Sequence, residues 1–259
     1  MLKTFFKYQS LGNDFIVFDW LSQPVEKIIQ QLSMQNWIFF VRKVCARNTG
    51  IGANNVLILK QNIEESIPEV VVFNADGSKA ETCLNGLRSV ALHLLSFHDF
   101  PSNFSSKIGK NLVWCEAIFH GTSEKKNIDI ITKIKKISFL GNRTIIAENK
   151  VFQGHLVNTG NPHFVIFKKV TIDWLRKYGK LLEGHSAFER GTNVEFVWKD
   201  FFQISYSQQK NYQLLVYERG CGITQSCGSG AASGGATPSL PKTCCTTSPT
   251  SSSPTVSSA

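Results

Sequence analysis

Two short motifs occur twice in this chain of 259 residues, in the same order and at nearly the same spacing. GNDF at 12–15 resembles GNPHF at 160–164, so Asn13 and Asn161 are 148 residues apart (161 − 13). Later in each half a cysteine precedes a turn of small residues, and Cys83 and Cys227 are 144 residues apart (227 − 83). Self-similarity of this kind constrains the fold, because each half must form a similar unit. The sequence therefore predicts a duplication, with two similar halves that face each other across a cleft.

Most of the predicted elements are strands. Runs rich in aromatic and β-branched residues, such as 14–20 and 68–74, favour strands, and turn residues separate them. Helices are fewer, and apolar spacing or turn chemistry predicts them at 24–35, 37–47, 86–97 and 172–182 and after Cys227. Many strands and few helices indicate the α+β class and not a parallel sheet of alternating strands and helices.

A change in composition near the end of the chain sets the last domain boundary. We expect an N-terminal half at 1–137 that carries Cys83 and a C-terminal half at 138–236 that carries Cys227. Ser, Thr and Pro make up 17 of the 23 residues at 237–259, too polar a composition to offset the cost of ordering the chain. This tail is expected to be disordered. It interrupts the helix after Cys227, so the C-terminal half is expected to be incomplete, and a shifted reading frame or truncated gene end is favoured over a linker.

The bulk composition excludes several function classes. Seven scattered cysteines without a C-x-x-C pair indicate reduced thiols in a cytoplasmic protein. Neither a secretory signal nor a membrane span is predicted. The net charge of +9 is spread thinly without a nucleic-acid motif, so we expect no nucleic-acid partner, although an acidic substrate is mildly favoured. No metal site is expected either, because metal-ligand spacing is not seen at His93, His98, His120, His155 or His185.

The two cysteines suggest proton transfer at carbon. A cysteine at a helix start meets the positive end of the helix dipole, which favours the thiolate, and the same free N–H groups bind a carboxylate. If a thiolate on one face removes an α-proton and a thiol on the other face delivers one, the stereocentre inverts without a cofactor. We therefore predict Cys83 and Cys227 as the catalytic pair. His163 and Glu218 are candidates to orient or deprotonate a sulfur, and Arg219 to hold a carboxylate.

Six blocks of the sequence resemble, in order, the signature blocks of the diaminopimelate epimerase family. They are SLGNDFIVFD, GIGANNVLIL, FNADGSKAETCLNGLR, NTGNPHFVIF, GTNVEFV and YERGCGITQSCGSGA, and they run from about Phe5 to about Ala232. The resemblance implies a cofactor-independent isomerase that interconverts LL- and meso-2,6-diaminopimelate in lysine and cell-wall synthesis. It also implies a cytoplasmic homodimer. Each half would be an α+β domain in which a barrel-like sheet surrounds a central helix, with the active site between the halves.

The resemblance also assigns roles to residues at matching positions. Cys83 and Cys227 would be catalytic, with assistance from His163 and Glu218. The residues directly after each cysteine would contribute turn N–H groups to the substrate. The substrate-binding residues that the resemblance implies are Asn13, Asn55, Asn74, Leu84, Asn85, Asn161, Asn193, Glu218, Arg219, Gly228 and Ser229.

Three departures from the family pattern leave alternatives open. Leu84 stands where the family has glycine, and its side chain is expected to crowd the ligand. Asn54 and Asn55 replace Asp and Gly or Gln. The family's last helix and strands are replaced by the tail, so a marginally stable or insoluble protein is expected. The alternatives are a related racemase acting on proline, hydroxyproline or glutamate, and a decayed relative without activity.

Overall fold

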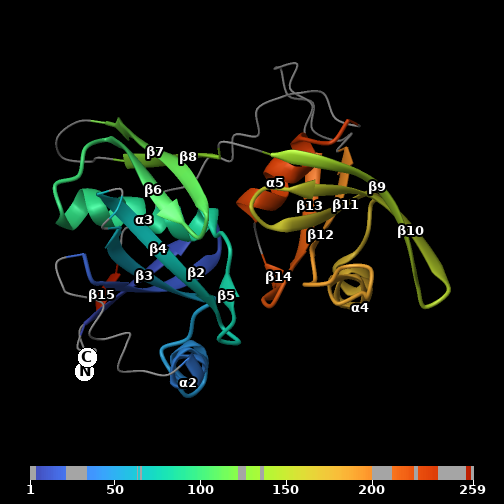
Figure 1. Ribbon diagram of the computed structural model, residues 1–259, viewed down its shortest axis with the longest axis horizontal. Coiled ribbons are helices and arrows are strands. Elements are labelled where there is room, and N and C mark those ends of the chain that lie inside the picture. Colours follow the sequence, from blue (N-terminus) through green and yellow to red (C-terminus); the bar gives the residue numbers. More distant parts are fainter. Residues whose placement is uncertain are drawn as a thin grey trace. The chain divides into compact units, whose positions relative to one another are not determined.

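The computed structural model describes residues 4–21, 34–62, 64, 66–121, 127–134, 137–199, 212–224, 227–238 and 255–257. The chain divides into two compact units, residues 1–135 with 247–259 and residues 136–246 (Figure 1). The helix predicted at 24–35 lies almost wholly outside the described residues. Among the helices that the structure describes, none combines the length and apolar character needed to cross a membrane.

A nine-stranded sheet forms the first unit. Its order is β15-β1-β2-β3-β4-β6-β7-β8, with β5 paired to β4. The β2–β3 and β4–β6 pairs are parallel, and the other pairs are antiparallel. The strand bounds are β1 Phe5–Ser10, β2 Asn13–Asp19, β3 Asn55–Asn62, β4 Ile67–Asn74, β5 Lys79–Ala80, β6 Asn103–Ile108, β7 Asn111–His120, β8 Asn127–Ile134 and β15 Thr255–Ser257.

Two helices cover opposite faces of this sheet. Helix α3 (Leu84–Phe97) lies inside the curl of the strands, and α2 (Met34–Cys45) packs on the outer face (Figure 1). The alternation of side chains along a strand explains this division. Phe15 and Val17 of β2 belong to the core around α3, whereas Ile16 between them belongs to the core under α2. The strands are apolar on both faces because both faces are buried.

A six-stranded sheet forms the second unit, in the order β14-β13-β12-β11-β10-β9. Only the β11–β12 pair is parallel. The strand bounds are β9 Ser138–Ala147, β10 Lys150–Asn158, β11 Pro162–Phe167, β12 Asn193–Lys199, β13 Tyr212–Glu218 and β14 Gly222–Thr224.

The helices of the second unit also lie on opposite faces of their sheet. Helix α4 (Ile172–Glu183) packs on Phe164 and Phe196, and α5 (Gly228–Gly235) contacts β11 and β12. Val165, adjacent to Phe164, belongs to the smaller core beside the end of α5. Residues of odd number in this part of β11 and β12 therefore face α5, and those of even number face α4.

The two units share one topology. In each, an antiparallel pair is followed by a parallel pair whose crossover contains a helix, then by an antiparallel strand and a short fifth strand. A second helix begins directly after the short strand, α3 after β5 and α5 after β14. The expected α+β fold of two similar strand-rich units is confirmed.

One stretch of the predicted tail is regular in the structure. Thr255–Ser257 forms β15, which pairs antiparallel with β1, so this stretch differs from the disorder expected for 237–259. Thr255 and Val256 are β-branched and suit an extended backbone. The outer edge of β1 otherwise presents unpaired N–H and C=O groups, which this strand satisfies.

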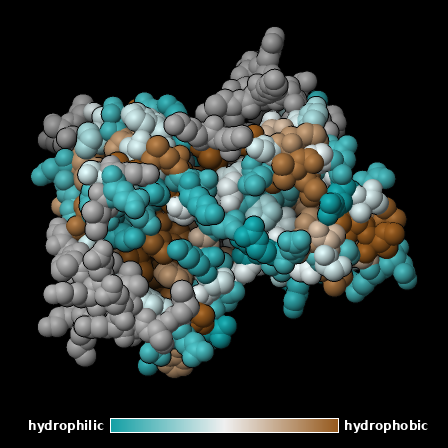
Figure 2. All heavy atoms as spheres, viewed as in Figure 1, coloured by the Kyte–Doolittle hydropathy of each residue, from teal (hydrophilic) through white to brown (hydrophobic). Residues whose placement is uncertain are grey.

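The β9–β10 hairpin carries apolar side chains on its outer surface. Ile146 and Val151 are direct cross-strand partners and are 65% and 61% exposed. Apolar (brown) spheres gather on this hairpin in Figure 2. Directly opposed side chains cover part of each other's surface. Scattered apolar residues of this kind are common on the surfaces of folded proteins.

Candidate active site

Both predicted catalytic cysteines stand at helix N-caps. Cys83 caps α3, and its sulfur accepts a hydrogen bond from the backbone N–H of Gly86 at 3.4 Å. Cys227 caps α5 and accepts the same bond from Gly230 at 3.3 Å. In each case the sulfur takes the place of the Ser or Asp oxygen that usually caps a helix. The two sulfurs therefore have the same local geometry in topologically equivalent places.

The glycine three residues after each cysteine is closely packed. A Cβ atom on Gly86 would lie 3.0 Å from the Leu57 side chain and 3.2 Å from the Cys83 sulfur. One on Gly230 would lie 2.9 Å from a carboxylate oxygen of Glu195. These contacts are tighter than ordinary packing allows, so a side chain at either position would force Leu57 or Glu195 to shift.

Three predicted asparagines gather in the first unit on the face that packs against α3. Asn13 begins β2, Asn55 begins β3 and Asn74 ends β4, and all three are buried. The Asn55 side-chain N–H donates to the Asn74 Oδ1 at 3.0 Å. Because Leu57 lies two residues after Asn55 and contacts the position of Gly86, the start of α3 lies at this end of the sheet. The structure thus brings these amides to the same region as Cys83.

An arginine and an amide of α3 lie close to Cys83. The Arg88 guanidinium donates to the Asn85 Oδ1 at 2.7 Å. Burial lowers the pKa of Arg88, and the nearby Cys83 and Cys115 sulfurs oppose that change. Arginine remains charged in proteins, so its positive charge favours the thiolate of Cys83.

The side chain of Leu84 packs in the core of the first unit. It is 5% exposed and belongs to the core around α3. This packing counts against the expectation that Leu84 crowds a ligand, which stays a prediction. The backbone N–H of Leu84 still lies in the first helical turn, where N–H groups have no partner within the helix.

Truncating Leu84 is therefore expected to affect stability. The Leu84→Ala change removes buried methyl groups from the core and should lower the free energy of unfolding by about 2 kcal/mol. Chemical denaturation monitored by circular dichroism measures this change. Leu140→Ala is the control, because Leu140 is 61% exposed on β9 and its loss should cost less than about 0.5 kcal/mol. Equal denaturation midpoints for the two variants would contradict the assignment of Leu84 to the core.

A buried acid–base pair lies behind Cys227 in the second unit. His163 and Glu195 face α5 from neighbouring strands, and both side chains are fully buried. The Nδ1 of His163 lies 2.6 Å from the Glu195 Oε1, and its Nε2 lies 3.0 Å from the Thr159 hydroxyl. Both imidazole nitrogens are thus engaged, and the second oxygen of Glu195 is buried without a hydrogen-bond partner among the described residues.

Sequence reasoning did not select Glu195 or Thr159. The available signal was a single charged residue inside NVEFVW, an otherwise apolar strand. A carboxylate is rarely buried without a partner or a function. Its partner, His163, is 32 residues away in the sequence, so the pairing depends on the parallel β11–β12 register.

Carboxylates and Cys227 influence each other's protonation. Glu218, the last residue of β13, accepts a hydrogen bond from the Thr224 hydroxyl. Burial raises the pKa of Glu218, while hydrogen bonds from Thr224 and Cys227 act against that rise. Burial, and then the negative charges of Glu218 and Glu195, raise the pKa of Cys227 well above its ordinary value. Cys227 is therefore a thiol at neutral pH.

The remaining predicted residues of the second unit lie around the same strand ends. The backbone N–H of Arg219 donates to the Asn193 Oδ1 at 2.9 Å, and the Arg219 guanidinium donates to the Arg190 carbonyl at 3.0 Å. Asn161 is buried directly before β11. Gly228 and Ser229 begin α5, with the Ser229 hydroxyl 3.3 Å from the Cys227 sulfur.

The residues around Cys83 and those around Cys227 occupy equivalent positions but differ in chemical character. Asn74 ends β4 and Glu218 ends the equivalent strand β13, and the two are 144 residues apart (218 − 74), the same offset as the two cysteines. One unit thus has an amide where the other has a carboxylate. The result is a thiol among carboxylates at Cys227 and a sulfur beside an arginine at Cys83.

Thiol reactivity gives a direct check on these environments. Burial raises the pKa of Cys45 to about 11 and that of Cys115 to about 12. At pH 8 only about a thousandth of Cys45 would then be thiolate, the form that reacts with iodoacetamide. The half-buried Cys83 should be alkylated before Cys45 and Cys115 in the native protein, as followed by peptide mass spectrometry. Equal labelling of Cys45 and Cys83 before unfolding would contradict this order, and urea-unfolded protein provides the reference rates.

This chain is similar to known proteins over most of its length. The family model described as diaminopimelate epimerase matches residues 5–103 and 155–238. A diaminopimelate epimerase of Hydrogenobaculum sp. is 34% identical over 246 residues, which cover 88% of this chain and 80% of that protein. One of Prochlorococcus marinus (strain NATL2A) is 30% identical over 243 residues, covering 89% and 81%.

Solved structures share the fold at much lower identity. A hydroxyproline epimerase from Agrobacterium vitis has a TM-score of 0.65 at 12% identity, over 90% of this chain and 75% of that one. A Bacillus anthracis protein of the PhzF family has a TM-score of 0.57 at 10% identity, over 90% and 78%. At these identities the likeness concerns the fold alone.

Proposed function

Because this chain belongs to the diaminopimelate epimerase family, we propose that it interconverts LL- and meso-2,6-diaminopimelate by moving the α-proton between two cysteine sulfurs. One observation carries the two-sulfur mechanism. Cys83 and Cys227 cap equivalent helices with the same sulfur geometry, yet Arg88 favours the thiolate of Cys83, whereas burial and two carboxylates favour the thiol of Cys227. Two groups in opposite protonation states are what a two-base inversion requires. The reaction belongs to lysine and peptidoglycan-precursor synthesis.

Substrate binding would use the helix starts. The N–H groups of Leu84 and Asn85 in one unit, and of Gly228 and Ser229 in the other, lie in first helical turns, where they favour a carboxylate. The Arg219 guanidinium is suited to a second, planar carboxylate contact. The asparagines at the strand ends, Asn13, Asn55, Asn74, Asn161 and Asn193, would bind the remaining polar groups of the diamino acid.

The direction of proton flow follows from the two environments. With Cys83 as the thiolate, its sulfur removes the α-proton and becomes a thiol. The Cys227 thiol gives its proton to the opposite face of the carbon and becomes a thiolate. Before the next turnover in the same direction, Cys83 must lose its proton to solvent and Cys227 must gain one from solvent. Glu218, hydrogen-bonded to Cys227, is suited to relay the incoming proton to that sulfur. The His163–Glu195 pair would hold the imidazole in place behind Cys227.

The arrangement of the two units is part of this proposal. The two sulfurs must approach one α-carbon from opposite sides, so the active site would lie between units that face each other. A homodimer in the cytoplasm also belongs to the proposal, as in the family that the sequence resembles. The proposed mechanism uses no cofactor.

Exchange of the α-proton with solvent tests the proposal. Protein incubated with LL-diaminopimelate in deuterated water should incorporate deuterium at the α-carbon and form the meso isomer, as followed by NMR and chiral chromatography. Proline, hydroxyproline and glutamate serve as parallel substrates and should exchange much more slowly. Folded protein that exchanges none of the four would refute the proposal, and faster exchange of another amino acid would replace the substrate.

A further inference from the structure

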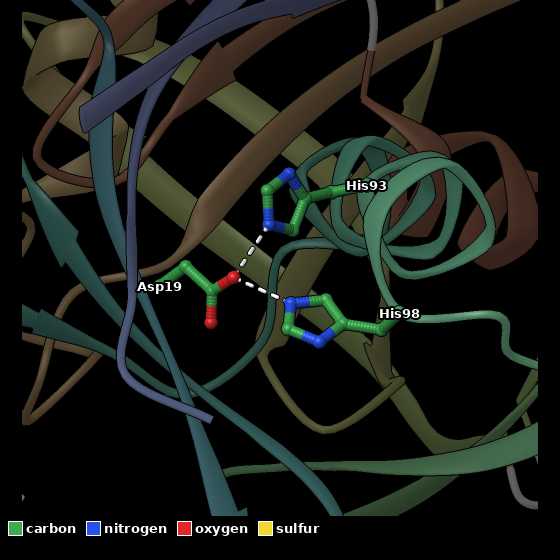
Figure 3. A group of neighbouring side chains, drawn as sticks. All are labelled: Asp19, His93 and His98. Carbon is green, nitrogen blue, oxygen red and sulfur yellow. Dashed lines mark hydrogen bonds and ion pairs between the residues drawn. The ribbon is translucent and has the colours of Figure 1, made fainter. Parts of the chain in front are cut away.

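A second cluster of reactive side chains lies at the opposite end of α3 from Cys83. Asp19 ends β2, His93 lies near the end of α3 and His98 caps the helix. Figure 3 shows both imidazoles directed at the same carboxylate oxygen, with the His93 Nε2 at 2.9 Å and the His98 Nε2 at 2.5 Å from the Asp19 Oδ2. His93 is ten residues from Cys83 (93 − 83), about 15 Å along the helix axis, so this cluster is separate from the candidate active site.

We propose that Asp19, His93 and His98 bind a divalent transition-metal ion such as Zn²⁺ through one carboxylate oxygen and two imidazole nitrogens. The three ligand atoms all lie within 4.8 Å of one another. Two nitrogens and one oxygen form a donor set of zinc sites that keep a fourth position for water, and they also suit iron(II). Calcium and magnesium prefer oxygen ligands only. The proposal does not depend on the proposed reaction.

The geometry needs little change to admit a metal ion. Zinc lies about 2.0–2.1 Å from nitrogen and 2.0–2.2 Å from oxygen, so tetrahedral ligand atoms are about 3.3 Å apart. The present separations of 2.9 Å and 2.5 Å would have to increase by less than about 1 Å. His98 caps the helix after its last turn, where a small movement of the side chain disturbs no regular structure.

Neighbouring groups already hold two of the ligands in position. The Nδ1 of His93 lies 2.8 Å from the Tyr8 hydroxyl, and the other Asp19 oxygen accepts the backbone N–H of Leu21 at 3.0 Å. Such second contacts orient the ligands in known metal sites. A hydroxyl both donates and accepts, so Tyr8 can serve either tautomer of His93. When the metal replaces the Nε2 proton, the Nδ1–H of His93 would donate to the Tyr8 oxygen.

The cluster is buried on the side of His93 and partly exposed on the side of Asp19 and His98, so a metal ion could enter from there. The His93 side chain is fully buried, with the rings of Phe6 and Phe97 packed 4.4 Å and 4.9 Å from its centroid. Asp19 and His98 remain 17% and 20% exposed, which leaves a route for the ion and a water ligand. A bound ion would join the end of β2 to the end of α3 and so stabilise the first unit.

An exposed pair on the same unit provides a matched control. The His120 Nε2 lies 2.9 Å from the Asp129 Oδ2, the same contact as in the cluster, but the side chains are 53% and 38% exposed. No further His, Cys, Asp or Glu completes a metal-binding group with this pair among the residues that the structure describes. A His–Asp contact alone should not bind a metal strongly.

Cobalt(II) binding to the metal-stripped full-length protein tests the proposal. We expect a visible d–d absorption spectrum without the near-ultraviolet sulfur-to-cobalt band that thiolate ligands give. His98→Ala should weaken binding at least about tenfold, and His120→Ala should not change it. Zn²⁺ should raise the thermal unfolding midpoint of the parent protein and of His120→Ala, but not that of His98→Ala.

Three outcomes would overturn the proposal. They are absence of the d–d spectrum in the parent protein, equal cobalt affinity in the parent and His98→Ala, and a sulfur-to-cobalt band that disappears in Cys83→Ser. If His98→Ala fails to fold, Tyr8→Phe keeps the three ligands and removes only the hydroxyl. That variant should bind cobalt about tenfold more weakly, and unchanged affinity would count against the site.

Discussion

Replacing either Cys83 or Cys227 with alanine is expected to lower the rate of epimerisation about 10²- to 10⁴-fold, the usual contribution of a positioned acid or base. Each variant keeps one sulfur and can therefore exchange a proton on only one face of the α-carbon. Cys227→Ala should still exchange the α-proton of one stereoisomer with solvent through Cys83, without inverting it. Cys83→Ala should show the same behaviour with the other stereoisomer.

Deuterium incorporation measured separately on the LL and meso isomers distinguishes this pattern from simple loss of structure. Cys45→Ala is the control, because Cys45 is the buried last residue of α2, on the opposite face of the sheet, and should affect stability but not the reaction. A variant of either catalytic cysteine that inverts the substrate at the parental rate would exclude the two-sulfur mechanism. Loss of exchange on both isomers in a folded variant would indicate that the two sulfurs act as one coupled group.

The internal repeat allowed the shared topology of the two units to be predicted from the sequence. The turn asparagines and the cysteines mark equivalent points of two units, so the near-constant offset predicted a shared topology that the structure confirms. The positions of both cysteines at helix starts followed from local patterns, since small residues after a cysteine indicate a cap and apolar spacing indicates the helix. Local patterns of this kind can be recognised directly in a single sequence.

The features that sequence reasoning missed depend on contacts between distant segments. Asp19 and His93 are 74 residues apart, and only the packing of α3 on the sheet brings them together. Histidine spacing alone indicated no metal site, because His93 and His98 lie five residues apart (98 − 93) and their shared partner is on a strand. The core packing of Leu84 could not be predicted for the same reason, since it depends on how α3 meets the sheet.

The second large effect is expected at Glu195. Glu195→Ala removes the hydrogen-bond partner of a fully buried histidine and should lower the free energy of unfolding by about 1–3 kcal/mol, the usual cost of leaving a buried polar group without its partner. Denaturant unfolding measures the change. Glu116→Gln is the control, because Glu116 forms an exposed contact with Lys133 on the first unit and should change stability by less than about 0.5 kcal/mol.

Glu195→Gln separates the charge of this residue from its shape. An amide oxygen can still accept a hydrogen bond from the His163 Nδ1, but the negative charge beside Cys227 is lost. Because that charge helps to raise the pKa of Cys227, the variant should lower it. Cys227 must be protonated to act as the acid, so activity in that direction should decline at a lower pH than in the parent protein.

The pH profile decides whether Glu195 is only a structural support. A purely structural role predicts that Glu195→Gln lowers stability and leaves the alkaline limb of kcat/KM in place. A role in holding the Cys227 proton predicts that this limb shifts toward neutral pH even where the protein is fully folded. Leu57, which contacts the Gly86 position as Glu195 contacts the Gly230 position, carries no charge, so the limb that reports on Cys83 should not move. A selective shift of one limb would therefore assign the resting proton to Cys227, and an equal shift of both limbs would show that the two cysteines titrate together.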